Sequence, residues 1–187
     1  MIKRFLLSLL AVGMLTSVAK GELILTIADD GFNLIMTMTG SYDLSAATQN
    51  GSFGLGSSAW VAPSFGVFGW EAIPGPGYEA TFTGSITSTG YATVPTNVST
   101  TTPIFFYGDV SRIVLQGGSP LIGSVNNTAV FEGVTLSSLG MVAGESMTVS
   151  WQGDSATIQV VPEPSTWTLM AVGAVAAFWR LRRRTTT

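Results

Sequence analysis

The chain has 187 residues, of which eight are basic and eleven acidic, and it contains neither cysteine nor histidine. The absence of both residue types excludes thiol nucleophiles, histidine general bases and the usual protein ligands of zinc. It also excludes disulfides, so a folded domain in this chain has to be stabilised by its hydrophobic core.

The first 21 residues have the three parts of a secretory signal peptide. Lys3 and Arg4 form a basic start, residues 5–15 form an apolar run, and the small residues Ala19 and Gly21 follow. This order is typical of a segment that is removed on export, and the apolar run is shorter than a permanent membrane anchor needs. We therefore expect residues 1–21 to form a signal helix, with cleavage after Ala19 or, preferably, after Gly21.

Residues 22–161 form the predicted body, which is strongly acidic. Arg112 is its single basic residue and stands against ten acids, which gives a net charge of −9. Such a body does not bind a phosphate backbone, so we expect no nucleic-acid partner. The same charge keeps the body soluble by self-repulsion and attracts divalent cations.

The first predicted elements are two strands that form a hairpin. Residues 23–28 and 33–42 are rich in apolar and hydroxylated side chains and flank the turn signal Asp29-Asp30-Gly31. Met36 and Met38 alternate with threonines, which predicts one apolar and one hydroxylated face.

Turn signals divide the middle of the body into shorter segments. Residues 53–68 are apolar but interrupted by glycine and proline, which predicts short strands joined by tight turns. Residues 73–77, Ile-Pro-Gly-Pro-Gly, read as a loop, and residues 78–86 alternate as one strand. Residues 85–103, rich in serine and threonine, are expected to form a long mobile loop or an edge strand.

The second half continues the same pattern. Further hairpins are predicted around Gly108-Asp109, around Asn126-Asn127 and around residues 152–155, with one helical turn at residues 136–140. The strands of these hairpins cover residues 104–107, 112–115, 121–125, 128–131, 146–151 and 156–161. About ten short strands with frequent turns predict an all-β body, namely a single antiparallel, jelly-roll-like β-sandwich.

The chain ends with three segments of different character. The motif Pro162-Glu163-Pro164 is held extended by its prolines, and an uncharged apolar run between Trp167 and Trp179 follows. Tryptophan favours the membrane interface, and a basic cluster after the run favours the cytoplasmic side. We expect a transmembrane helix over about residues 166–181 and a basic stop-transfer tail within residues 180–184, formed by Arg180, Arg182, Arg183 and Arg184. A C-terminal helix docked on the body is the alternative, because the apolar run is short for a span.

This arrangement resembles the PEP-CTERM sorting signal of exported bacterial proteins, with the motif at residues 162–165 and the whole signal at residues 162–187. The resemblance implies export and passing attachment to the membrane through the C-terminal helix. It also implies processing by an exosortase and delivery to the cell surface or the extracellular matrix. The implied partners are the export machinery and the exosortase, with exopolysaccharide as a further candidate.

Two weaker chemistries remain for the body. Carboxylate pairs such as Glu71 with Glu79, or Asp109 with Glu132, could support glycoside hydrolysis, but nothing in their spacing requires a pair. The oxygen-rich turn at residues 29–33 offers calcium ligands without the spacing of a calcium-binding loop. We therefore expect no catalytic residue, no metal and no cofactor, with a divalent-dependent hydrolase as the least favoured reading.

Aromatic residues suggest another function, because exposed rings can stack on sugars. Trp70 and Tyr78 flank the loop at residues 73–77 and are the candidate ligand-binding residues, with Trp70 expected to be exposed. Trp60 and Trp151 are expected in the core. The predicted function is a non-enzymatic structural or adhesive role at the cell surface or in the matrix. The alternative is a carbohydrate-binding module that acts on exopolysaccharide.

Overall fold

The computed structural model describes residues 22–53, 59–70, 74–92 and 95–162. The predicted signal helix, the predicted transmembrane helix, Glu163, Pro164 and the four C-terminal arginines lie outside these residues. The described part of the chain contains no helix that is long and apolar enough to cross a membrane.

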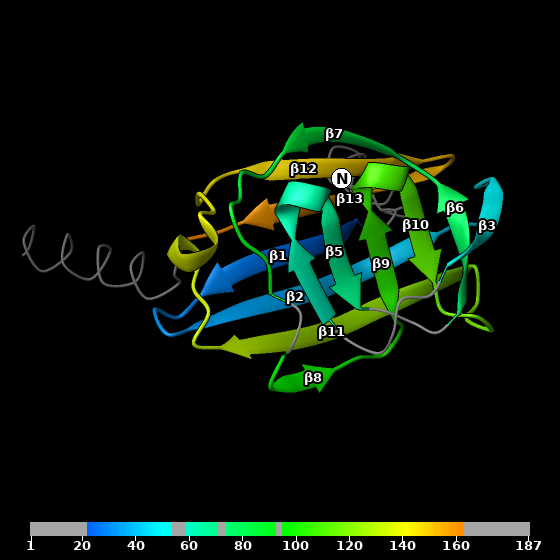
Figure 1. Cartoon of the computed structure of the whole chain (residues 1–187). Helices are drawn as coiled ribbons and strands as arrows, with labels where there is room; N and C mark the ends of the chain where they lie inside the picture. Colours follow the sequence, from blue (N-terminus) through cyan, green and yellow to red (C-terminus); the bar gives the residue numbers. More distant parts are fainter. Residues whose placement is uncertain (1–21, 54–58, 71–73, 93–94, 163–187) are drawn as a thin grey trace, which may run out of the picture.

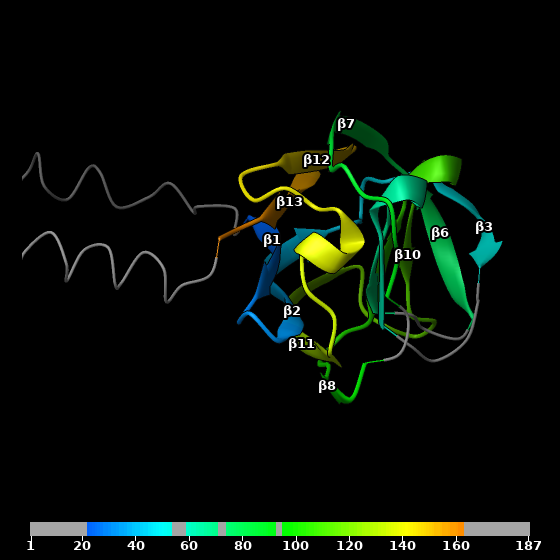
Figure 2. The ribbon, with the colours of Figure 1, turned by 60° about the vertical axis from the view of Figure 1, so that its left-hand side comes forward.

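The described residues form two β-sheets that face each other as two layers (Figures 1 and 2). The larger sheet has seven strands in the order β7-β12-β13-β1-β2-β11-β8. Their bounds are Leu23–Asp29 for β1, Asn33–Asp43 for β2, Thr81–Ser85 for β7, Asn97–Ser99 for β8, Ile122–Glu132 for β11, Ser146–Trp151 for β12 and Asp154–Val160 for β13.

The smaller sheet has six strands in the order β3-β6-β10-β9-β5-β4. Their bounds are Gln49–Phe53 for β3, Ala59–Ala62 for β4, Val67–Trp70 for β5, Gly75–Glu79 for β6, Ile104–Tyr107 for β9 and Arg112–Leu115 for β10. Three short 3₁₀ helices connect strands: η1 (Pro63–Phe65), η2 (Gly108–Val110) and η3 (Ser137–Leu139). The prediction of an all-β fold is confirmed, and its jelly-roll likeness stays a prediction.

The first hairpin follows directly from the sequence pattern. Every second residue is buried throughout β1 and in β2 from Leu34 to Met38, and Met36 and Met38 are completely inaccessible to solvent. Ile27 lies opposite Met36 in the antiparallel register, so both strands turn their apolar faces to the same core. The predicted strands, their turn and the apolar face are confirmed.

The predicted antiparallel pairing holds for most strand pairs, but the pairing of β1 with β13 departs from it. These two strands run parallel, with Leu23 opposite Ala156 and Ile27 opposite Val160. A parallel pair cannot be joined by a tight turn, and here almost the whole body separates the two strands. The first and last strands therefore lie side by side within the larger sheet, although no turn motif in the sequence predicts that they pair.

The prediction of one continuous strand over residues 78–86 is wrong, because these residues belong to two strands. The prediction of a loop over residues 73–77 is wrong for residues 75–77, which belong to β6. The chain pairs as β6 in the smaller sheet up to Glu79 and as β7 in the larger sheet from Thr81. Gly75 is the first residue of β6, and only glycine fits there, because a Cβ atom would lie 2.0 Å from the backbone oxygen of Leu115. The glycine is needed for close strand packing and not for a turn.

The predicted turn at Asn126-Asn127 is also wrong, because β11 runs through it without interruption. Asn127 is fully buried, and its Oδ1 accepts a 2.7 Å hydrogen bond from the amide of Thr101 while its Nδ2 donates to the oxygen of Thr102. The asparagine fastens the preceding loop to the sheet. Within the region expected to be a loop or an edge strand, β8 is an edge strand paired with β11.

Candidate functional site

The two aromatic residues predicted to contact a ligand are both in the core. Trp70 is 2% exposed and Tyr78 is 4% exposed, and each packs within the main hydrophobic cluster. Burial raises the pKa of the Tyr78 hydroxyl above its ordinary value, because the ionised form loses its hydration. The expectation that Trp70 is exposed is wrong, and neither ring has a free face for a sugar.

Of the two carboxylate pairs considered for catalysis, only Asp109 and Glu132 are both described by the structure, and they lie on different sheets. Glu71 lies outside the described residues, and Glu79 lies at the end of β6. Asp109 lies in η2, which connects β9 and β10 of the smaller sheet, whereas Glu132 ends β11 opposite Asn33 in the larger sheet.

In the oxygen-rich turn at residues 29–33, the carboxylates of Asp29 and Asp30 accept hydrogen bonds from the protein itself. Asp30 accepts hydrogen bonds from the amides of Phe32 and Asn33 and from the Asn33 side chain. These bonds favour the carboxylate and lower the pKa of Asp30. Asp29 is buried and accepts a 2.6 Å bond from the amide of Leu136, which anchors the η3 segment. In the described ranges no three acidic residues are close enough to hold a metal ion.

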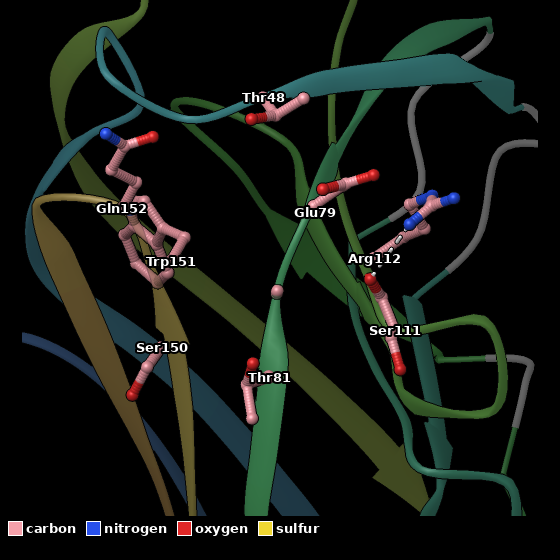
Figure 3. A pocket seen from close by; sticks show the side chains of 9 residues that line it. Thr48, Glu79, Thr81, Ser111, Arg112, Ser150, Trp151 and Gln152 are labelled. Carbon is pink, nitrogen blue, oxygen red and sulfur yellow. Dashed lines mark hydrogen bonds between the residues drawn. The ribbon is translucent and has the colours of Figure 1, made fainter.

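A groove of about 660 Å³, seen in Figure 3, opens on the described surface. Its lining is mostly polar and combines residues from strand ends and turns of both sheets with the core residue Trp151. The groove is lined by Thr48, Glu79, Ala80, Thr81, Ser111, Arg112, Ser150, Trp151 and Gln152.

One wall of the groove carries a cation and an anion on neighbouring strands. Arg112 at the start of β10 lies opposite Glu79 at the end of β6. Glu79 Oε1 accepts a 2.8 Å bond from the side-chain Nδ2 of Asn50. Arg112 Nη1 donates a long 3.4 Å bond to the oxygen of Ser111, drawn in Figure 3. Arg112 Nε is buried and has no hydrogen-bond partner among the described residues.

The same wall contains an unusual backbone conformation. Ser111 has a φ of 52°, the one positive φ outside glycine among the described residues. A left-handed residue with a side chain costs on the order of 1 kcal/mol. The Ser111 carbonyl accepts a 3.1 Å bond from the amide of Ala80, which joins the β6–β7 corner to the start of β10.

The opposite wall is formed by the end of β12. Trp151 is 7% exposed, and its indole Nε1 donates a 2.7 Å bond to the oxygen of Asp43. The tryptophan is core, as predicted, and contributes only an edge to the groove. Ser150 and Gln152 beside it are exposed. The groove therefore offers hydroxyl, amide, carboxylate and guanidinium groups, with Trp151 as its only aromatic lining residue.

The two sheets form an all-β domain. In the sequence, this domain is followed directly by the Pro-Glu-Pro motif, an apolar run and a basic cluster. Residues 160–184 match the family model described as PEP-CTERM protein-sorting motif. The chain therefore carries this sorting motif, as its sequence predicted, and the motif implies export, membrane-associated sorting and processing by an exosortase. No match was found among curated proteins, and none among solved structures.

Proposed function

We propose that this chain is an exported component of the cell surface or extracellular matrix, with a non-enzymatic structural or adhesive role. Its β-domain is the functional unit, and its C-terminal signal is processed by an exosortase. The observation that carries the proposal is the position of the sorting motif. The match begins at Val160, which is the last residue of β13.

The end of the sheet supports release of an intact domain. The Val161 amide donates a 2.9 Å bond to the oxygen of Ile27, and Pro162, which has no amide hydrogen, follows directly. Ladder bonding of β13 therefore ends where the motif begins. A cut after Pro162 would remove the tail and leave all thirteen strands of the described body complete.

The outer surface suits a hydrated environment. Exposed positions of the larger sheet carry small hydroxylated side chains, such as Thr39, Thr83 and Thr148. The Thr157 hydroxyl donates a 2.6 Å bond to Glu22 Oε1, so the first residue after the predicted cleavage site belongs to this surface. Together with the charge of −9 over residues 22–161, these groups favour a soluble, water-binding domain.

Fractionation of the native host, combined with intact mass measurement, tests the proposal. We expect a species that begins near Glu22, ends near the Pro162–Pro164 motif and lies outside the membrane. Replacing Pro162, Glu163 and Pro164 with alanine should keep the full-length chain in the membrane, whereas the control Pro120→Ala in an exposed loop should not. Unchanged release of the triple variant would contradict the proposal.

A carbohydrate-binding module is the second candidate. Its predicted aromatic platform is not available, because Trp70 and Tyr78 are buried. The observation that favours it is the groove, whose exposed hydroxyl, amide and charged groups are those that proteins use to bind sugar hydroxyls.

A further inference from the structure

The single basic residue of the body lies in its groove. Arg112 is the one cation between residues 22 and 161, and yet no carboxylate forms an ion pair with it in the described part of the chain. A guanidinium has five N–H donors, and the described contacts of Arg112 use one of them, at 3.4 Å. The side chain therefore has donor capacity that the protein itself does not satisfy.

Glu79 supplies acceptors beside these donors. It lies directly opposite Arg112 in the β6–β10 register, and both side chains line the groove. Asn50 holds Oε1 of Glu79 in place, and Oε2 makes no bond to a described residue. Figure 3 shows the two side chains on neighbouring strands, with Trp151 and Gln152 on the far side of the groove.

Adjacent donors and acceptors match a pair of neighbouring hydroxyl groups. Each hydroxyl can accept a bond from a guanidinium and donate one to a carboxylate, so a vicinal diol satisfies both side chains at once. A polyanionic ligand fits less well, because it would meet Glu79 and a body of net charge −9. The volume of about 660 Å³ is within the range of small-ligand sites.

We propose that the groove binds a neutral, hydroxyl-rich saccharide, with Arg112 donating to and Glu79 accepting from adjacent sugar hydroxyls. Thr81, Ser150 and Gln152 provide further hydrogen-bonding groups along the groove. Trp151 forms an apolar edge and no stacking platform, since its ring is almost completely buried. The inference deepens the adhesive part of the proposed function and rests on it, because the ligand would be a matrix polysaccharide.

The test uses the full chain in detergent, with affinity electrophoresis and calorimetry against three neutral probes and one acidic probe. The neutral probes are dextran, mannan and cellohexaose, and the acidic probe is polygalacturonate. We expect binding to at least one neutral probe, reduced about tenfold or more by Arg112→Gln and by Glu79→Gln, which corresponds to one lost charged hydrogen bond. Glu132→Gln makes the same charge change outside the groove and should leave binding unchanged.

The sign of the Glu79→Gln effect separates the neutral diol from an acidic ligand. Removing a negative charge weakens binding of a neutral diol but strengthens binding of a polyuronate. Stronger polygalacturonate binding by Glu79→Gln, binding that both variants leave unchanged, or no binding to any neutral probe would each overturn the proposal. Thermal unfolding of each variant checks folding, and Glu79→Gln carries the test if Arg112→Gln does not fold.

Failure of this experiment leaves the sorting proposal unaffected. Release from the membrane depends on the motif at Pro162–Pro164 and is read by fractionation, whereas the groove variants change only side chains of the body. A chain that is released normally and binds no neutral sugar would disprove the groove assignment alone.

Discussion

The backbone amide of Asp43 donates a 2.9 Å hydrogen bond to Oδ2 of Asp154, which lies 111 positions further along the chain. On the same peptide segment, the oxygen of Asp43 accepts the indole N–H of Trp151. The end of β2 is therefore fastened to the β12–β13 hairpin by two bonds. This corner positions Trp151 and Gln152, which form one wall of the groove.

Removing the Asp154 carboxylate should loosen this corner. Asp154→Ala leaves the amides of Asp43 and Ser155 without their acceptor, and we expect a loss of about 2 kcal/mol in the free energy of unfolding. Urea unfolding followed by tryptophan fluorescence measures the loss. Asp109→Ala, in the exposed η2 turn, is the matched control. Equal midpoints for the two variants would show that the corner contributes no stability.

Asn127 should be more sensitive than its neighbour Asn126. Asn127→Ala removes a fully buried side chain together with its hydrogen bonds to residues 100–102, which should cost about 2–3 kcal/mol. Asn126 is exposed on the other face of β11, so Asn126→Ala should change stability by less than about 0.5 kcal/mol. Hydrogen exchange at residues 100–102 should accelerate in the first variant only. Similar exchange in both would argue against the anchoring role.

Elements with a local signal could be predicted closely from the sequence. The strands expected at residues 104–107 and 112–115 coincide with β9 and β10, and β12 begins and ends where it was expected. In each case a turn signal joins two apolar segments that pair with each other. The information needed was contained within about twenty residues.

Elements that depend on distant partners could not be predicted in this way. Gly75 is of a residue type typical of turns but lies in a strand, where the nearby Leu115 backbone leaves room only for glycine. Asn127 is likewise typical of a turn but bonds to a loop 25 positions earlier. The groove has the same origin. The sequence identified Arg112 as the single base of the body, but only the β6–β10 register places it opposite Glu79.

The body should lose stability at alkaline pH through its buried tyrosines. Burial raises the pKa of Tyr42 and Tyr78 above the ordinary value of 10.0, so the folded state holds these protons more tightly than the unfolded chain does. Their contribution is fully present below about pH 10 and is lost as the pH rises through the folded-state pKa. Tyr78→Phe should reduce the alkaline loss in urea midpoints measured from pH 8 to 11. Tyr91→Phe, which removes a hydroxyl from a side chain that is 64% exposed, should not.

The last strand should decide whether a released body can fold. β13 lies between β12 and β1, and its apolar residues Ala156, Ile158 and Val160 are at most 1% exposed. Burial of the two larger side chains alone is worth about 1.5–3 kcal/mol each, and loss of the strand also exposes the edges of both neighbours. The loss is therefore comparable with the lower part of the total stability of about 5–15 kcal/mol that is typical of a domain.

We therefore expect a chain of residues 22–162 to unfold cooperatively in urea, with the same circular dichroism as the released protein. A chain of residues 22–153, which lacks β13, should show no cooperative transition. Cooperative unfolding of the shorter chain with the same midpoint would contradict the central role of β13. Failure of residues 22–162 to fold would contradict the boundary between body and tail. Since β13 ends where the sorting motif begins, the sheet can be completed only after the chain has been exported almost up to the motif.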